Sequence, residues 1–418
     1  MGERFHLVTL GCPKNQVDSD KLAGALLADG MESTDEVGDA DLVVVNTCAF
    51  VEDARRESVD TILAAAASRR PGARLVVTGC LAERSGAELA AAMPEIDAVA
   101  GFATAVPVTL GRAPSAAPAF DLLHLPRPAP SAPWAYVKVA EGCDRACGFC
   151  AIPSFRGPQR SRTIDDLLSE VESLAGNGVQ EIVLVAQDLA SYGRDQGTGE
   201  RAIVPLVERV AAIVPWVRLL YVYPVDLTDE LERVLCEVAL PYVDLSLQHV
   251  SRPLVRRMRR WGDGERFRAR IDSIRAARPD AAFRSNFIVG YPGETEDDHD
   301  QLLRFVHDVR LDWCGFFAYS EEAGTYSAGL DGAVPPALVA ERLRELGELQ
   351  DRITAERRDE LLGAQVRVLV DAPGVARSHR EAPEIDGTIA VPEHLAVGAF
   401  HDVVVVGAVG PDLEARAL

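Results

Sequence analysis

Short apolar runs alternate with longer segments that mix Ala and Leu with charged residues over the first hundred positions. The apolar runs are FHLVTL at 5–10, LVVV at 42–45 and LVVT at 75–78. β-branched runs that are each followed by an amphipathic segment are typical of parallel strands covered by helices. The pattern therefore predicts an N-terminal α/β domain with a parallel sheet.

A second alternating series follows a stretch rich in Pro and Ala, which we interpret as a linker over 112–133. Its apolar runs predict six strands, at 135–140, 181–186, 217–222, 242–247, 283–289 and 314–318. Their spacing of roughly 30 to 40 residues is that of βαβ units, so we expect a (β/α) barrel or partial barrel.

The last part of the chain changes its pattern twice. A long helical segment, LVAERLRELGELQDRITAERRDELLG, ends at Gly363. Short β runs, VRVLV, GTIAV and DVVVVGAV, then indicate a small, OB-like β-barrel. The fold class is thus α/β with an all-β C-terminal module. The predicted limits are 1–111 for the first domain, 112–133 for the linker, 134–332 for the partial barrel, 333–363 for a connecting helix and 364–418 for the β-barrel.

The composition of the chain limits the binding partners and the cellular compartment that we expect for it. The 43 Lys and Arg against 64 Asp and Glu give a formal charge of −21, which repels phosphate backbones and suits a basic protein partner. The uncharged stretch at 98–111 is too short to span a membrane, and the N-terminus MGERFHLVTLGC lacks the pattern of a secretory signal. We therefore expect a cytoplasmic protein, with no stable nucleic-acid or membrane binding, whose eight cysteines are reduced.

Three of the cysteines follow the three N-terminal apolar runs. Cys12, Cys48 and Cys80 end the sequences LGC, NTC and TGC. Ligands in open α/β sheets bind at the carboxyl ends of strands, so neighbouring strands would bring these three thiols together. Buried cysteines without a ligand are the alternative, because Cys is among the most buried residue types.

Three more cysteines share one loop, EGCDRACGFC, as Cys143, Cys147 and Cys150. Three thiolates can hold three irons of a [4Fe–4S] cluster and leave the fourth iron open for a small molecule. A zinc loop completed from elsewhere and buried cysteines without a ligand are the alternatives. We interpret the remaining two, Cys236 and Cys314, as core residues.

The spacing C-x-x-x-C-x-x-C after the first strand of a βα barrel resembles that of the radical S-adenosylmethionine superfamily. The sequences EGCDRACGFCAIPSFRGPQRSR, LGCPKNQVDSD, NTCAF and TGCLAER resemble its methylthiotransferase family. The resemblance implies a transferase with two [4Fe–4S] clusters, the second held by Cys12, Cys48 and Cys80. It also implies S-adenosylmethionine as both radical source and methyl donor. The radical would take a hydrogen atom from the substrate, and the second cluster would carry the methylated sulfur.

The resemblance suggests further site residues at strand ends. Residues similar to superfamily contacts with the ribose, methionine and adenine of the cofactor are Gln187, Asp188, Gly290, Pro292, Gly293 and Glu294. A Gly/Pro turn after a strand is also ordinary loop chemistry, so both interpretations stay open.

No catalytic residue is assigned beyond the cluster ligands, but His249 and Arg156 are further candidates. His249 lies in LSLQHV, which resembles the family's PLQH-type motif with Ser246 in place of proline, and a structural histidine is the alternative. Arg156, Arg160 and Arg162 would suit an acidic substrate or the cofactor carboxylate, or belong to a solvated charge run. An arginine near the site is expected to hold a substrate carboxylate, without indication of which one.

Two substrates divide the family: an adenosine of transfer RNA, modified at its 2-position, and an aspartate of ribosomal protein S12, modified at its β-carbon. LGCPKN, FVEDARRESVDTIL, QD…SYG and REAPEIDG resemble the ribosomal-protein branch, and the last domain resembles the TRAM module. That module has four Arg and no Lys against eight Asp and Glu, which favours a basic protein over RNA.

We therefore expect a monomeric aspartate methylthiotransferase that acts on S12 and takes electrons from a donor such as a flavodoxin or ferredoxin. A transfer-RNA methylthiotransferase and a non-catalytic iron–sulfur or zinc protein remain the alternatives.

Overall fold

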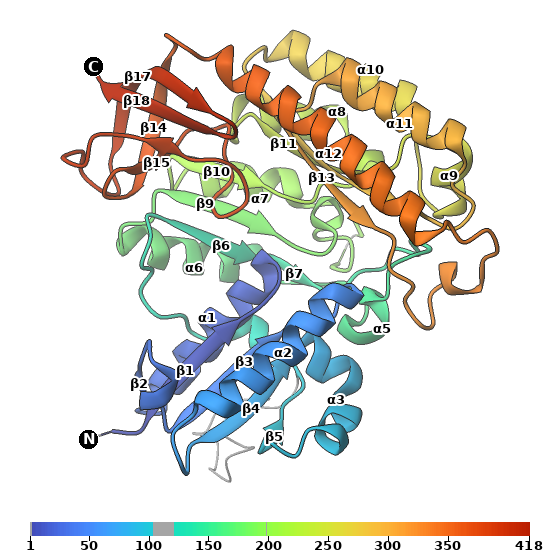
Figure 1. Cartoon of the computed structure of the whole chain (residues 1–418). Coiled ribbons are helices and arrows are strands. Elements are labelled where there is room, and N and C mark those ends of the chain that lie inside the picture. The colour runs from blue at the N-terminus through green and yellow to red at the C-terminus, as the bar shows by residue number, and fades with distance from the viewer. Residues whose placement is uncertain (1, 103–120, 198) are drawn as a thin grey trace.

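The structure, a computed structural model, describes residues 2–102, 121–197 and 199–418. Part of the predicted linker therefore lies outside the described residues. An α/β domain, an open barrel of parallel strands and a small β-barrel follow one another along the chain (Figure 1). This order confirms the predicted fold class.

The N-terminal domain is built on a parallel sheet with the strand order β2-β1-β3-β4-β5. The strands are β1 (Arg4–Thr9), β2 (Glu32–Ser33), β3 (Leu42–Thr47), β4 (Arg74–Gly79) and β5 (Ala98–Val99), and the helices are α1 (Pro13–Ala28), α2 (Glu52–Ser68) and α3 (Cys80–Ala92). Every residue of β3 is buried, because helices cover both faces of the sheet. Val43 and Val45 pack in one core with Ile62 of α2, whereas Leu42 and Val44 pack in another with α1.

Six parallel strands form the central domain, at the positions that the apolar runs predict. They are β6 (Trp134–Lys138), β9 (Glu181–Val185), β10 (Trp216–Leu219), β11 (Tyr242–Gln248), β12 (Ala282–Val289) and β13 (Trp313–Ala318). Two three-stranded sheets, β6-β9-β10 and β11-β12-β13, meet at a parallel bridge between Val222 and Leu245. The result is an open, partial barrel.

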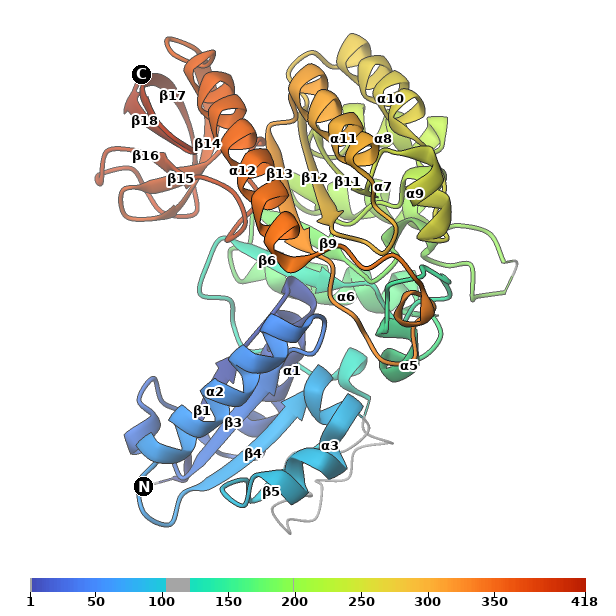
Figure 2. The ribbon, with the colours of Figure 1, turned by 45° about the vertical axis from the view of Figure 1, so that its right-hand side comes forward.

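Helices follow the barrel strands and cover the outside of the barrel (Figure 2). They are α6 (Ile164–Gly176), α7 (Ile203–Ala211), α8 (Asp229–Glu237), α9 (Arg252–Arg257), α10 (Gly264–Ala277), α11 (Glu296–Val309) and α12 (Pro336–Asp359). Thr163, Thr228 and Thr295 cap α6, α8 and α11 by accepting a backbone N–H three residues further on. In the described part of the chain no helix has the length and apolar character needed to cross a membrane.

A closed five-stranded barrel with the order β14-β15-β16-β18-β17 ends the chain. Its strands are β14 (Gln365–Ala372), β15 (Val375–Arg377), β16 (Ile389–Ala390), β17 (Phe400–Val409) and β18 (Asp412–Ala417). The apolar runs predict β14, β16 and β17 but give no sign of β15 and β18. In β18, only Leu413 and Ala415 are buried between exposed or half-buried charged residues, so no continuous apolar run marks the strand.

The C-terminal barrel contacts the central barrel where the central strands begin. The Tyr242 hydroxyl donates to Asp386 at 2.6 Å, and Trp313 Nε1 donates to the Arg380 carbonyl at 2.8 Å. Tyr242 and Trp313 are the first residues of β11 and β13. The segment 378–386 therefore covers the beginnings of these strands, at the end opposite to the cysteine loop.

Candidate functional site

Cys12, Cys48 and Cys80 lie where three neighbouring strands end. Strand β3 pairs with both β1 and β4, Cys12 is the N-cap residue of α1, and Cys80 begins α3. Burial raises the pKa of the Cys48 thiol to about 11, and the Cys12 and Cys80 thiolates act in the same direction. Charges exert such an effect only at short range. The structure thus brings the three N-terminal thiols together.

Glycines let the strand ends approach these thiols. Gly11 and Gly79 have φ angles of +94° and +91°, in the region that favours glycine. A Cβ on Gly11 would lie 2.9 Å from the Cys48 Sγ, and one on Gly79 would lie 2.3 Å from the Asn46 Oδ1. The LGC and TGC sequences are therefore required by the shape of the site as well as by its sulfur atoms.

Cys143, Cys147 and Cys150 lie in the loop between β7 (Ala140–Glu141) and α5 (Ile152–Arg156). The Arg145 amide donates to the Cys143 Sγ at 3.4 Å, and Arg260 Nη1 donates to the Cys147 Sγ at 3.3 Å. Burial raises the pKa of the Cys143 thiol to about 11 and that of Cys150 to about 12. Such thiols keep their protons at neutral pH until a metal displaces them.

Each group of three offers free thiols that could hold a metal group. Among the described residues, no three His, Cys, Asp or Glu side chains meet at a point that would hold one metal ion. A cubane cluster needs another arrangement, because each iron takes one thiolate and the thiolates stand around the cluster. All six are free thiols, and Cys80, Cys143 and Cys147 accept N–H donors, which is compatible with this arrangement; each group would leave one iron open.

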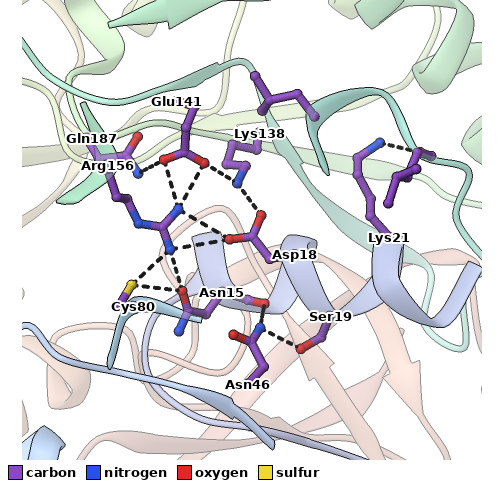
Figure 3. A network of polar contacts seen from close by, with 12 residues as sticks. Asn15, Asp18, Ser19, Lys21, Asn46, Cys80, Lys138, Glu141, Arg156 and Gln187 are labelled. Carbon is purple, nitrogen blue, oxygen red and sulfur yellow. Dashed lines mark hydrogen bonds and ion pairs between the residues drawn. The ribbon is translucent and has the colours of Figure 1, made fainter. Parts of the chain in front are cut away.

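A buried polar network runs from Cys80 to Glu141, which lies two positions before Cys143 (Figure 3). Arg156 donates to both carboxylate oxygens of Glu141, at 2.8 and 2.9 Å, and to the Cys80 Sγ at 3.0 Å. Lys138 bonds to Glu141 at 2.6 Å and also to Asp18 of α1. Burial raises the pKa of Glu141, but Arg156 and Lys138 lower it well below its usual range. The N-terminal domain thus meets the central barrel through charged side chains that are kept from water.

Gln187 and Asp188, which follow β9, each have one polar side-chain atom in use and one oxygen unused. Gln187 Nε2 donates to Glu141 at 2.7 Å, and Asp188 Oδ2 accepts from Arg145 Nε at 2.6 Å. Gln187 Oε1 and Asp188 Oδ1 are buried and have no partner among the residues that the structure describes. These two oxygens are therefore available to a polar ligand.

Glu294, in contrast, is used within the protein. Its carboxylate accepts from the Gly290 amide at 2.5 Å and from Arg342 at 3.0 Å. Gly290 and Gly293 have φ angles of +81° and +88°. The carboxylate and the glycines together fix the shape of the loop at 290–294.

His249 is fully buried. The Ser251 amide donates to its Nδ1 at 3.1 Å, and its Nε2 has no partner in the described part of the chain. Burial lowers the pKa of His249 to about 4. The side chain is thus a neutral imidazole that carries its proton on Nε2.

The three arginines of SFRGPQRSR all meet carboxylates of the chain. Arg156 belongs to the buried network described above. Arg160 is exposed and pairs with Asp121, and Arg162 pairs with Glu170 at 2.7 Å. Their charges are therefore balanced within the protein.

Two further arginines beside the cysteine loop escaped the sequence analysis. The guanidinium groups of Arg145 and Arg260 lie 4.2 and 4.1 Å from the centroid of the Tyr223 ring. Arg145 lies between Cys143 and Cys147, so its position in the sequence could have identified it as a residue of the site. Arg260 is 113 positions from Cys147, and nothing in its local sequence indicates the contact.

Lys14 is a third cationic residue that sequence reasoning left without a role. Its Nζ lies 3.8 Å from the centroid of the Tyr221 ring of the central barrel. Tyr221 has a φ of +65°, which is uncommon for a residue other than glycine and typical of functional sites. Lys14 is half-buried and forms no ion pair with any described residue. Among the described residues, the domain interface thus holds a cation without an ion pair two positions from Cys12, and its charge acts to lower the pKa of the Cys12 thiol and of the Asp244 carboxyl.

Three family models match successive parts of the chain. Residues 4–101 match the uncharacterized protein family UPF0004, residues 137–306 match the radical SAM superfamily, and residues 362–418 match the TRAM domain.

Curated relatives resemble the chain over almost its whole length. The ribosomal protein uS12 methylthiotransferase RimO of Cutibacterium acnes is 39% identical, with 98% of this chain and 97% of the relative covered. The protein of the same name from Moorella thermoacetica is 42% identical over 93% of each chain. That from Saccharopolyspora erythraea is 40% identical over 99% of this chain and 95% of its own.

Solved structures share the fold at low sequence identity. A radical S-adenosylmethionine methyltransferase, TsrM, from Kitasatospora setae has a TM-score of 0.55 at 15% identity, with 95% of this chain and 84% of that chain covered. The cobalamin-dependent S-adenosylmethionine radical enzyme OxsB has a TM-score of 0.52 at 10% identity, with 83% of this chain and 56% of that chain covered.

Proposed function

The chain belongs to the ribosomal protein uS12 methylthiotransferases (RimO), and from this premise we propose that it attaches a methylthio group to the β-carbon of an aspartate in ribosomal protein S12. It is a radical S-adenosylmethionine transferase. The observation that supports the proposal most directly is the pair of three-cysteine groups, one on each domain, with a buried network that runs from Cys80 to Glu141 beside the second group.

Each part of the site has a task in this reaction. When bound, the two clusters would supply the electron that cleaves S-adenosylmethionine and the sulfur of the methylthio group. Cys143, Cys147 and Cys150 would hold the first cluster, and Cys12, Cys48 and Cys80 the second, which we call the auxiliary cluster. The unpaired oxygens of Gln187 and Asp188 would bind S-adenosylmethionine. The buried network would keep the substrate carbon within reach of both groups.

An aspartate substrate brings a carboxylate, and we assign Lys14 as the cation that holds it. Arg145 and Arg156 already bond to carboxylates of the chain, whereas Lys14 forms no ion pair with a described residue. Lys14 lies beside Cys12 and reaches across the domain interface to Tyr221. An ammonium on a flexible stem can follow a carboxylate carried by a protein loop.

The proposal extends to partners and compartment. A basic ribosomal protein suits the net acidic C-terminal barrel, which would bind RNA poorly. We propose a cytoplasmic monomer without stable nucleic-acid binding, reduced by a flavodoxin or a ferredoxin.

The test is a direct assay of both substrates. The protein is reconstituted with iron and sulfide without oxygen, reduced, and mixed with S-adenosylmethionine and either S12 protein or unmodified transfer RNA. Mass spectrometry then looks for CH₃S in place of H. We expect this gain on an S12 aspartate, and its loss in Cys143→Ala.

Two results would contradict the proposal. A gain on transfer RNA instead of S12 would overturn the substrate. No 5′-deoxyadenosine in any mixture, with both clusters loaded, would return the cysteines to a structural role.

A further inference from the structure

The Arg156 side chain connects Cys80 of the N-terminal group to Glu141, two positions before the other cysteine loop. It is the last residue of α5, directly after the loop of Cys143, Cys147 and Cys150, and its side chain is 2% exposed. Its guanidinium reaches back across the interface to Cys80, which belongs to the N-terminal domain. Figure 3 shows the side chain between Glu141 on one side and Cys80 on the other.

The contacts of Arg156 use the planar fork of a guanidinium. Nη1 donates to Glu141, and Nη2 donates to the Asn15 Oδ1 at 2.7 Å and to the Cys80 Sγ at 3.0 Å. Both nitrogens lie 3.3 Å from Asp18. A lysine has the charge but not the geometry, so it cannot make these contacts at once.

The charges around Arg156 are balanced before the thiolate is counted. The network has two cations, Arg156 and Lys138, and two carboxylates, Asp18 and Glu141. The guanidinium also lies 4.4 Å from the centroid of the Phe102 ring. Since water is excluded, the guanidinium acts strongly on the Cys80 sulfur 3.0 Å from its Nη2, and the Asp18 carboxylate opposes this effect.

We propose that Arg156 is a positioning residue for the auxiliary cluster, which raises the reduction potential of that cluster through Cys80 and fixes Cys80 relative to the other cysteine loop through Glu141. The inference rests on the proposed function, because it takes Cys12, Cys48 and Cys80 as cluster ligands. A hydrogen bond and a positive charge at a ligand sulfur favour the reduced, more negative state of a cluster.

The test isolates the auxiliary cluster in the full chain. A parent protein with Cys143→Ala, Cys147→Ala and Cys150→Ala can load only the N-terminal group. Arg156→Met and Arg156→Lys are made in this parent, and Arg209→Met serves as control because Arg209 is a half-exposed surface arginine paired with Asp165. Iron content, the electron paramagnetic resonance of the reduced cluster and its midpoint potential are measured for each.

We expect a more negative potential in Arg156→Met than in the parent, an intermediate one in Arg156→Lys and no shift in the control. An iron-loaded Arg156→Met with the potential of the parent overturns the inference. If Arg156→Met binds no iron, the midpoint potential of Arg156→Lys is the deciding measurement. A potential equal to that of the parent protein would also overturn the inference. A parent that binds no iron would refute the proposed function itself, which is a separate outcome.

Discussion

At the scale of single residues, the charged side chains of the domain interface are of two kinds. Most form ion pairs, whereas Lys14 forms none with a described residue. Arg156, Lys138, Asp18 and Glu141 satisfy one another away from water, as buried charges must. Lys14 is only half-buried and rests on the Tyr221 ring, which stabilises an ammonium without neutralising it. A bound carboxylate would complete that contact.

Replacing Lys14 tests its assignment. A charge-assisted hydrogen bond is worth about 1.5 to 3 kcal/mol, so Lys14→Met should raise the KM for S12 by roughly 10- to 100-fold. Lys14→Arg should recover most of the loss. Initial rates over a range of S12 concentrations give KM and kcat separately, and an unchanged KM in Lys14→Met would contradict the assignment.

Asp386 makes stability depend on pH. Burial raises the pKa of this carboxyl from 3.8 to about 6. Because the folded-state pKa is the higher one, the contribution of the protonated carboxyl is fully present below about pH 4 and is lost as the pH rises through 6. Two pKa units correspond to about 3 kcal/mol.

Asp386→Asn should therefore flatten the pH dependence in that window. The free energy of unfolding, measured by urea titration between pH 4 and 7, should fall more steeply in the unmodified protein than in the variant. Parallel curves for the two proteins would show that Asp386 ionises normally.

At the scale of elements, apolar runs located every strand of the central barrel, because most residues of those strands are apolar and at least half-buried. The same criterion missed β18, whose buried Leu413 and Ala415 alternate with charged residues. It could not place α5 either, a five-residue helix whose position depends on the loop before it. A strand that is buried can be recognised from its own few residues. The position of a short helix such as α5 depends on contacts with residues far away in the sequence.

The start of α11 allows a test of a single element. Thr295 and Asp298 form a capping box, in which the Thr295 hydroxyl accepts from the Asp298 amide at 3.2 Å. Thr295→Ala should cost about 1 kcal/mol of unfolding free energy, because a helix N–H loses its acceptor. Thr295→Ser keeps the oxygen and should cost much less. Equal losses in the two variants, measured by denaturant titration, would exclude the cap as the cause.

At the scale of the whole molecule, a second contact fixes the N-terminal domain on the barrel. Glu322 lies in the loop after β13, with a side chain that is 2% exposed. Arg55 of α2 and Arg84 of α3 both donate to its Oε2 at 2.6 Å. The two cysteine groups are thus held in register from two sides.

Glu322→Gln should loosen this attachment, because two arginines lose a buried carboxylate. Hydrogen–deuterium exchange, followed by mass spectrometry, should accelerate in the peptides that carry Arg55 and Arg84. The exposed neighbour Glu321 provides the matched control as Glu321→Gln. Unchanged exchange in Glu322→Gln would show that the network of Arg156 suffices to hold the domain.

Only part of the candidate site could be predicted from the sequence. The six cysteines stood out because of their spacing and because they follow predicted strands. The bond between Arg156 and Cys80 joins residues 76 positions apart, and Lys14 meets Tyr221 only once two domains are docked. Such pairs form only when distant parts of the chain fold together, and they cannot be recognised in a single sequence.

The segment 378–386 has a consequence for the order of events in a catalytic cycle. It covers the beginnings of β11 and β13, and the cysteine loop lies at the opposite end of the central barrel. A protein substrate that approaches the cysteines from that end would have to present its aspartate on a bent loop. The modified loop must then withdraw by the same opening before another can follow, which makes departure of the product a candidate for the slowest step.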